Sequence, residues 1–233
     1  MRVEIDDAGT GSPVGGVVIG ILKGQVFNYR VLPVTLFREE SNKTNAEVKD
    51  EVLNAVLELL KTLNFDPELD EIYICRGDIF SHVHRYFEEM GYMWLPSKID
   101  SKLQDLVEAA FDFHLVELGV PRLLVKRLYA YWHYATELLK WVVLDMDSRE
   151  KFVKTRFPVW KNEWKYARLT FEKGVSNRVL YCIECGDCIE KREQIITVKI
   201  KTPRRGVKTY LHKSCFEKLE DRMVNHIESS GVS

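Results

Sequence analysis

Long hydrophobic runs are absent from this 233-residue chain. No stretch of eighteen apolar residues occurs, which excludes a conventional membrane-spanning helix. A strand is predicted directly after Met1, which leaves no room for a secretory signal peptide, so we expect a cytoplasmic protein. Glutamine is scarce: three residues occur beside 34 lysines and arginines and 35 acids, a balance typical of hyperthermophile proteins. With 45% hydrophobic residues, the chain can form one core of about 150 residues and an appendage.

An excess of charge of one sign is also missing, because the formal net charge is −1. The charges are nevertheless segregated along the chain. Residues 1–150 contain 16 lysines and arginines and 25 acids, a balance of −9, whereas residues 151–213 contain 16 and 6, a balance of +10. A basic segment joined to an acidic body favours a polyanion as partner.

The hydrophobic pattern predicts an alternation of strands and helices in the first half of the chain. The predicted elements are strands at 2–7, 17–23 and 25–37, a helix at 45–63, a strand at 71–75, a helix at 79–90, a strand at 92–99 and a helix from 100 or 101 to 118. A long apolar helix follows at 122–144. The order β-β-β-α-β-α-β-α predicts an α/β fold with one mixed sheet and helices on its faces.

The first predicted strand ends in two acids, Asp6 and Asp7, and a glycine-rich turn leads into the second strand. Carboxylates at the end of a buried strand are costly unless a positive charge lies beside them. A divalent metal commonly supplies that charge, and such sites commonly cleave or transfer phosphate esters. An acidic hairpin loop with two solvated carboxylates is the alternative interpretation.

The run DDAGTGSP at 6–13, followed by a second hydrophobic strand, resembles ribonuclease HII and the wider RNase H-like superfamily. In that enzyme the first strand ends in Asp-Glu-Ala-Gly-Arg-Gly, and a proline and a second strand follow. Asp6 matches the first catalytic acid, Asp7 stands where the enzyme has glutamate, and Thr10 replaces the arginine. The resemblance implies an RNase H-like fold and a two-metal nuclease whose carboxylates bind Mg²⁺ or Mn²⁺.

In the RNase H-like family, a second acid ends the fourth strand beside the first, and a third lies on the helix after the fifth strand. The resemblance assigns the second role to Asp78, and capping the helix that starts at Ile79 is the alternative. For the third role, Asp105, Glu108 and Asp112 stand at i, i+3 and i+7 and share one helix face. A solvated face of an amphipathic helix is the alternative for these acids.

The segment 104–110 also resembles the last helix of Holliday-junction resolvases, in which two acids three residues apart bind metal. The predicted catalytic residues are therefore Asp6, Asp7, Asp78, Asp105 and Glu108. The residues predicted to bind the Mg²⁺ or Mn²⁺ ions are Asp6, Asp78, Asp105 and Glu108. Asp145 and Asp147, after the predicted helix at 122–144, are the alternative third pair. Cys75 is expected to be a buried thiol of the fourth strand.

Four of the five cysteines lie in the last third of the chain. Cys182-x-x-Cys185 and His212-x-x-Cys215 provide the ligands of a tetrahedral zinc site, which would be structural because all four positions are filled. A hairpin is predicted between the two pairs and a helix at 216–227 after them, so the region resembles treble-clef zinc domains. Cys188 is a spare thiol that could replace a ligand, and a disulfide is the alternative.

A basic segment with interleaved aromatic residues extends over 151–173. Cations bind phosphates and aromatic rings stack on unpaired bases, so this mixture favours single strands over duplexes. The alternative is that the aromatic rings dock the appendage onto the body. Together with the cationic hairpin tip, the predicted nucleic-acid-binding residues are Lys161, Trp164, Lys165, Arg168, Lys201, Arg204, Arg205 and Lys208.

The chain as a whole resembles a small archaeal family with an RNase H-like body and a cysteine-rich tail, which degrades single-stranded DNA from the 3′ end. We therefore expect a nuclease domain at 1–150, a basic aromatic linker at 151–178 and a zinc-finger-like domain at 179–230. The expected activity is that of a metal-dependent single-stranded DNA 3′–5′ exonuclease. An endonuclease of the ribonuclease HII or resolvase kind and a non-catalytic nucleic-acid-binding protein are the alternatives. The oligomeric state is left open.

Overall fold

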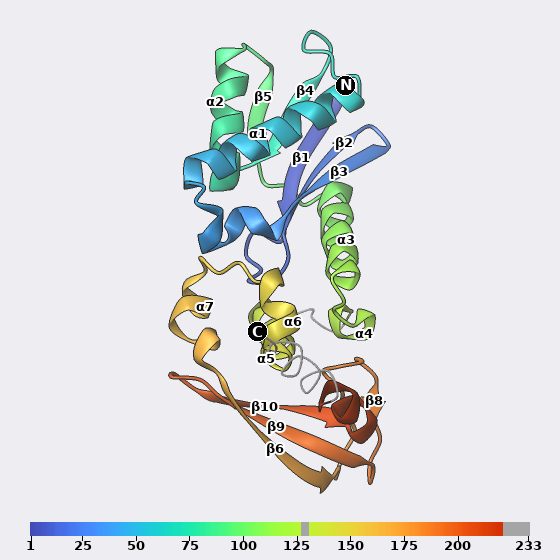
Figure 1. The fold of residues 1–233 in the computed structure, drawn as a ribbon. Helices are drawn as coiled ribbons and strands as arrows, with labels where there is room; N and C mark the ends of the chain where they lie inside the picture. The colour runs from blue at the N-terminus through green and yellow to red at the C-terminus, as the bar shows by residue number, and fades with distance from the viewer. Residues whose placement is uncertain (127–130, 221–233) are drawn as a thin grey trace. The chain divides into compact units, whose positions relative to one another are not determined.

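The computed structural model describes residues 1–126 and 131–220, with the side chains of 131–133 left out of the description. The chain divides into two compact units, Met1–His114 and Leu115–Ser233 (Figure 1). The sequence analysis places the boundary at 150, whereas the structure groups residues 115–150 with the second unit.

The first unit is built on a five-stranded mixed sheet with the strand order β3-β2-β1-β4-β5. The strands are β1 (Arg2–Ala8), β2 (Val17–Lys23), β3 (Val26–Leu32), β4 (Glu71–Cys75) and β5 (Trp94–Ser97). Strand β1 pairs antiparallel with β2 and parallel with β4, while β5 is parallel to β4. The predicted element order and the mixed character of the sheet are confirmed.

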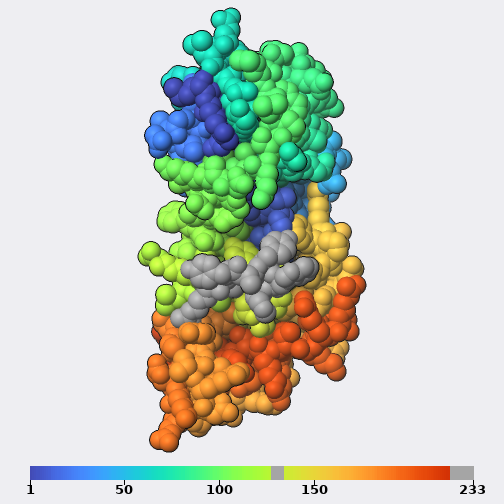
Figure 2. Space-filling view, turned by 180° about the vertical axis from the view of Figure 1, so that it is seen from behind, coloured from blue at the N-terminus to red at the C-terminus, as the bar shows by residue number. Residues whose placement is uncertain are grey.

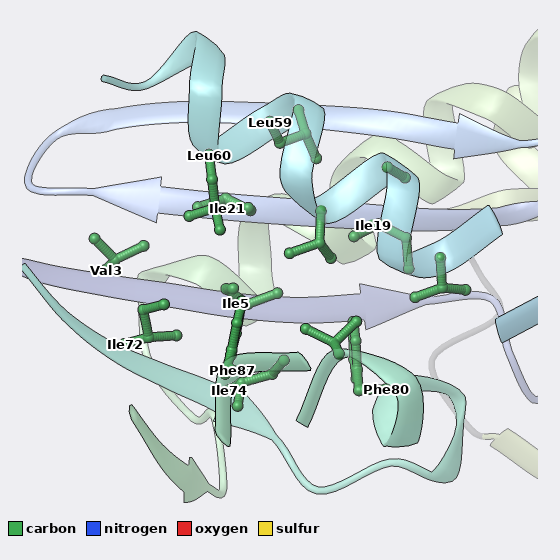
Figure 3. Close-up of a cluster of buried hydrophobic side chains, with 14 of the residues drawn as sticks. Val3, Ile5, Ile19, Ile21, Leu59, Leu60, Ile72, Ile74, Phe80 and Phe87 are labelled. Carbon is green, nitrogen blue, oxygen red and sulfur yellow. The ribbon is translucent and has the colours of Figure 1, made fainter. Parts of the chain in front are cut away.

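One face of this sheet is covered by α1 (Asn45–Thr62) and α2 (Ser81–Glu89), as Figure 3 shows. Val3 and Ile5 of β1 and Ile74 of β4 are fully buried in the core on this side. Because side chains alternate along a strand, Glu4 and Asp6 of β1 point to the opposite face. Helix α1 begins with a capping box formed by Thr44 and Glu47, which fixes where it starts.

Helix α3 (Lys102–Glu117) packs on that opposite face, and its first 13 residues belong to the first unit. A Cβ atom on Gly20 of β2 would lie 2.2 Å from Val107 Cγ1, so the helix approaches the strand as closely as glycine permits. Gly9 has a φ of +89° and lies against the ring of Phe111 in the same way. In Figure 2, green residues of this region lie next to the dark blue N-terminal residues. Helix α3 therefore covers the end of β1 that carries the acids.

The second unit contains helices and a second sheet. The labelled α-helices are α4 (Arg122–Val125), α5 (Tyr131–Val143), α6 (Met146–Arg149) and α7 (Pro158–Asn162). Residues 213–220 are also helical, which confirms the helix predicted at 216–227 in its described part, while 221–227 lie outside the described residues. The sheet has the order β10-β9-β6, and the strands β7 (Leu180–Tyr181) and β8 (Cys188–Ile189) form a small ribbon. Strands β9 (Gln194–Lys201) and β10 (Gly206–His212) confirm the predicted hairpin.

One prediction for the second unit needs correction, and a second can be compared only in part. The segment predicted as a linker at 151–178 contains α7 and strand β6 (Arg168–Val175), which pairs with β9 along its whole length. The helix predicted at 122–144 consists of α4 and α5 in its described part, and residues 127–130 between them lie outside the described residues. Within the part of the chain that the structure describes, no helix has the length and apolar character needed to cross a bilayer.

Candidate metal centres and cationic surface

The acids of β1 meet a thiol of the neighbouring strand. In the parallel register of β1 and β4, Ile5 lies opposite Ile74, so Asp6 and Cys75 follow at the same level. One ligand atom each of Asp6, Asp7 and Cys75 lies within 4.8 Å of the others. The Cys75 thiol donates a hydrogen bond to the Asp6 carboxylate. Strand pairing therefore gathers these three side chains at the sheet edge where β1 and β4 end.

Asp6 is a buried acid, with 7% of its surface exposed. Burial raises the pKa of its carboxyl from 3.8 to about 6, and the negative charges of Asp7 and Glu108 act in the same direction. Hydrogen bonds from the Asp7 backbone and from Cys75 offset part of this rise. Among the described residues, no cationic side chain forms an ion pair with Asp6. The negative charges of Asp7 and Glu108 thus lie near a carboxyl group that is already poorly solvated.

Cys75 belongs to this site, which the sequence analysis did not predict. Burial and the charge of Asp6 raise the pKa of its thiol to about 11, so Cys75 is a neutral S–H donor here. Sequence reasoning treated it as an ordinary strand thiol. In the sequence, only the position of Cys75 at the end of the fourth strand indicates a role in this site. The register of β4 with β1 places Cys75 beside Asp6.

Helix α3 contributes Glu108 and Asp112 on the side that carries Asp6. Glu108 raises the pKa of Asp6 and also that of Asp112, although burial is the larger cause for both. Asp105, the predicted partner of Glu108, is exposed and is not among the groups that act on Asp6. The structure therefore brings Glu108 toward the β1 acids, and Asp112 lies near Glu108 on the same helix.

Asp78 lies away from this cluster. The chain turns after β4, and Asp78 begins the short helix η3 (Asp78–Phe80) with 88% of its side chain exposed. Lys49 Nζ of α1 donates to both of its carboxylate oxygens, at 2.9 and 2.8 Å. Asp78 also makes no capping hydrogen bond at the start of α2. Asp78 therefore pairs with Lys49 in solvent and is not part of the group formed by Asp6, Asp7 and Cys75.

Asp145 and Asp147, the alternative third pair of acids, lie in different surroundings. Asp145 is 3% exposed, and its Oδ2 lies 3.8 Å from Arg149 Nε. Arg149 stacks 4.3 Å over the Trp141 ring and donates to both carboxylate oxygens of Glu184 at 2.8 and 2.9 Å. Asp147 is exposed on α6. Asp145 thus serves a buried ionic network within the second unit.

The predicted zinc ligands converge. One ligand atom each of Cys182, Cys185, His212 and Cys215 lies within 4.8 Å of the others. His212 Nδ1 lies 3.4 Å from Cys185 Sγ and 3.9 Å from Cys215 Sγ, while Nε2 lies 3.1 Å from the carbonyl oxygen of Cys188. Donation of Nε2–H to that carbonyl leaves Nδ1 facing the thiols, the arrangement typical of a metal-ligating histidine. The donor set and its geometry fit a structural zinc ion.

Local backbone geometry forms the knuckle that carries the first two cysteines. Gly186 has a φ of +77°, and its N–H donates to the Cys182 carbonyl at 2.8 Å. A Cβ atom on Gly186 would lie 2.8 Å from Leu123 Cβ of α4, so glycine is required for packing as well as for the turn. All five cysteines are free thiols, and the exposed Cys188 takes part through its carbonyl oxygen, not its sulfur.

Burial corrects one predicted nucleic-acid contact. Trp164 is fully buried, so its ring is not available to stack on a base. Arg205 also has a structural partner, because its Nε donates to the buried Glu163 at 2.8 Å. Thr202 Oγ1 donates to the same carboxylate oxygen at 3.0 Å. The aromatic residues Trp160 and Trp164 are therefore core residues, in line with the alternative that they serve packing.

Most of the other predicted cations are accessible. Lys161 is half-buried, and the exposed members of the set are Lys165, Arg168, Lys201, Arg204 and Lys208. They belong to the second unit, near η5 (Trp164–Tyr166) and on the three strands of its sheet and the hairpin tip. The structure thus retains a cationic surface where the sequence predicts one.

No protein-family model matches this chain, and a comparison with curated proteins finds no match. Fold and site define an α/β protein with a mixed parallel and antiparallel sheet, an acidic cluster at the end of β1 and a Cys₃His cluster near the C-terminus.

Proposed function

We propose that this protein is a metal-dependent nuclease with an RNase H-like first unit, acting on single-stranded DNA. The observation that carries the proposal is the burial of the Asp6 carboxylate beside Asp7 and near Glu108, two acids whose negative charges add to the rise of its pKa. Groups so arranged repel each other until a divalent ion joins them. The preference for DNA and the 3′–5′ direction rest on the family resemblance.

The strand arrangement supports the RNase H-like assignment. The element order is the one that this family has, and β4 lies parallel to β1 so that both strands end at the same edge. A helix after the fifth strand carries further acids toward this edge, as the family also requires. The departure from the family pattern is at β4, where Cys75 takes the place beside Asp6 and Asp78 lies beyond it.

The residues present fit an oxygen-liganded ion in part. Asp6 and Asp7 would hold it, and Glu108 with Asp112 would complete the acidic surroundings from α3. Such an ion, Mg²⁺ or Mn²⁺, lowers the pKa of bound water and stabilises charge on the phosphate. The raised pKa of Cys75 keeps its thiol protonated, and the S–H group donates a hydrogen bond that orients the Asp6 carboxylate. In this proposal Cys75 is therefore not a ligand of the ion.

A cleavage assay with two matched variants tests the proposal. The zinc-loaded protein is incubated with 5′-labelled single-stranded DNA and either Mn²⁺ or Mg²⁺, with RNA and duplex DNA as comparison substrates. We expect shortening of the single strand, loss of this activity by at least about 100-fold in Asp6→Asn, and a change of only a few-fold in Asp78→Asn. Cleavage by Asp6→Asn at the wild-type rate would remove the basis for the proposal.

A further inference from the structure

The three-stranded sheet of the second unit has one buried face and one open face. Val198 and Ile200 of β9 and Leu211 of β10 are buried on the inner side. Because side chains alternate, their neighbours along the strands point outward. The outward residues include four cations, which are exposed: Arg168, Lys199, Lys201 and Lys208. Strand pairing therefore gathers positive charge on the open face.

Two of these lysines oppose each other directly. Lys199 of β9 pairs with Lys208 of β10 in the antiparallel register, and Thr170 of β6 completes the row. Like charges at directly opposed positions destabilise a sheet unless an anion lies between them. Arg168 and Lys201 form the next row toward the hairpin tip. The two rows offer adjacent positions for phosphate groups.

One acid lies on the same face. Glu172 forms an ion pair with Lys199, and the two side chains are 50% and 45% exposed. Exposed ion pairs contribute little to stability, so a phosphate can displace this carboxylate at small cost. Lys208 stands opposite Lys199 in the strand register, and the ion pair of Glu172 is with Lys199.

A pocket adjoins the cationic rows. In the register, Thr197 and Tyr210 form the row next to Lys199 and Lys208, away from the hairpin tip. The pocket has a volume of about 340 Å³, and its lining includes Ser176, Asn177, Arg178, Thr197 and Tyr210. This size lies within the range of about 300–1,000 Å³ typical of small-molecule pockets. It combines an aromatic ring with hydroxyl, amide and guanidinium groups, the set that recognises a nucleobase.

The zinc cluster supports the wall of this pocket. Cys182 forms a β-bridge with Tyr210, and the N–H of Ile183 donates to the Tyr210 carbonyl at 3.0 Å. His212 is the next outward residue of β10 after Tyr210. The knuckle and the histidine ligand thus fix the backbone on both sides of Tyr210.

We propose that the open face of this sheet is a binding site for single-stranded nucleic acid. Phosphates lie on the rows of Lys199, Lys208, Arg168 and Lys201, and one unpaired base enters the pocket against Tyr210. The site needs no ion at Asp6. Only its role in holding the strand for cleavage rests on the proposed nuclease function.

Fluorescence anisotropy with a labelled oligo-dT tests the site. The protein is the zinc-loaded full chain carrying Asp6→Asn, without Mg²⁺ or Mn²⁺, so that cleavage cannot affect binding. The double variant Lys199→Ala/Lys208→Ala removes two phosphate contacts. We expect the slope of log affinity against log salt to flatten by about 1.4, at about 0.7 per contact on a single strand. The control Lys61→Ala/Lys218→Ala removes two exposed lysines elsewhere and keeps the original slope.

The pocket is tested by changes to its wall. Tyr210→Ala should weaken binding about five- to 150-fold, equivalent to about 1–3 kcal/mol for one stacked base, while Tyr210→Phe retains the ring and the affinity. Zinc content and the melting curve report whether Tyr210→Ala is folded. Asn177→Trp fills the pocket while leaving Tyr210 in place and should weaken binding as well.

The outcomes separate this site from the nuclease proposal. If binding depends on the lysine rows and the pocket but the wild-type protein with Mn²⁺ or Mg²⁺ does not cleave, the binding site is supported and the nuclease proposal is overturned. Equal binding by the Lys199/Lys208 variant and its control, or by Asn177→Trp and the unmodified pocket, overturns the site even where cleavage is observed. Preference for duplex DNA over oligo-dT also contradicts it.

Discussion

Asp6→Asn should make the zinc-loaded protein more stable in the absence of Mg²⁺ and Mn²⁺, while removing its activity. In the folded chain, the pKa of Asp6 is raised from 3.8 to about 6, so the folded form holds its proton more tightly than the unfolded form. The ionised carboxylate therefore opposes folding at neutral pH. Replacing it by a neutral amide removes that cost, and the amide oxygen still accepts the hydrogen bond from the Asp7 backbone.

The size and the pH range of the effect follow from the same values. A rise of the pKa from 3.8 to about 6 corresponds to about 3 kcal/mol as an upper limit, and because solvent screens the strand end we expect a gain between about 1 kcal/mol and this limit. Below 3.8 both forms are protonated and the variant has no advantage. The advantage grows as the pH rises from about 4 to about 6 and is complete above that range.

Urea unfolding at a series of pH values measures this difference. Both proteins are kept zinc-loaded and free of Mg²⁺ and Mn²⁺, and hydrogen exchange of the β1 peptide identifies unfolding of the first unit. Asp78→Asn is the control, because its solvent-exposed carboxylate pairs with Lys49 and has no comparable burial. A stability difference between wild type and Asp6→Asn that is absent, or that does not change between about pH 4 and pH 8, would refute the reasoning.

Three further predictions concern packing and the zinc cluster. Cys182→Ser should lose the zinc ion and lower the melting temperature, whereas Cys188→Ser keeps one zinc per chain by mass spectrometry of metals; equal zinc content in both would contradict the ligand assignment. Trp164→Ala should cost about 3–5 kcal/mol in urea unfolding, against about 0.5 or less for the exposed Lys165→Ala, and similar costs would show that Trp164 is not a core residue. Gly20→Ala places a methyl group 2.2 Å from a side chain of α3 and should lower stability by about 1–3 kcal/mol; an unchanged urea midpoint would argue against this packing.

Features that depend on local sequence could be predicted. The order of strands and helices in the first unit follows from hydrophobic periodicity, which each segment carries by itself. The Cys182–Cys185 knuckle and the His212–Cys215 pair are short motifs, and their ligand spacing is independent of the rest of the fold. The hairpin of β9 and β10 connects them, so its prediction needed only turn residues and alternation.

Features that depend on pairing between distant segments could not be predicted. Whether Cys75 or Asp78 lies beside Asp6 is decided by the register of β1 and β4, which the sequence does not state. Whether Asp105 or Asp112 accompanies Glu108 depends on how α3 is placed on the sheet. The burial of Trp164 is of the same kind, because an aromatic ring among cations suits a core as well as a binding surface.

Binding of Mn²⁺ to the β1 acids tests the central claim most directly. The zinc-loaded protein is titrated with Mn²⁺, and the free ion is followed by its electron paramagnetic resonance signal. We expect saturable binding by the wild type and by Asp78→Asn, and binding weakened by more than about tenfold in Asp6→Asn. Binding of Mn²⁺ by Asp6→Asn with wild-type affinity, or the absence of binding by the wild type, would contradict the claim that this buried carboxylate holds a divalent ion.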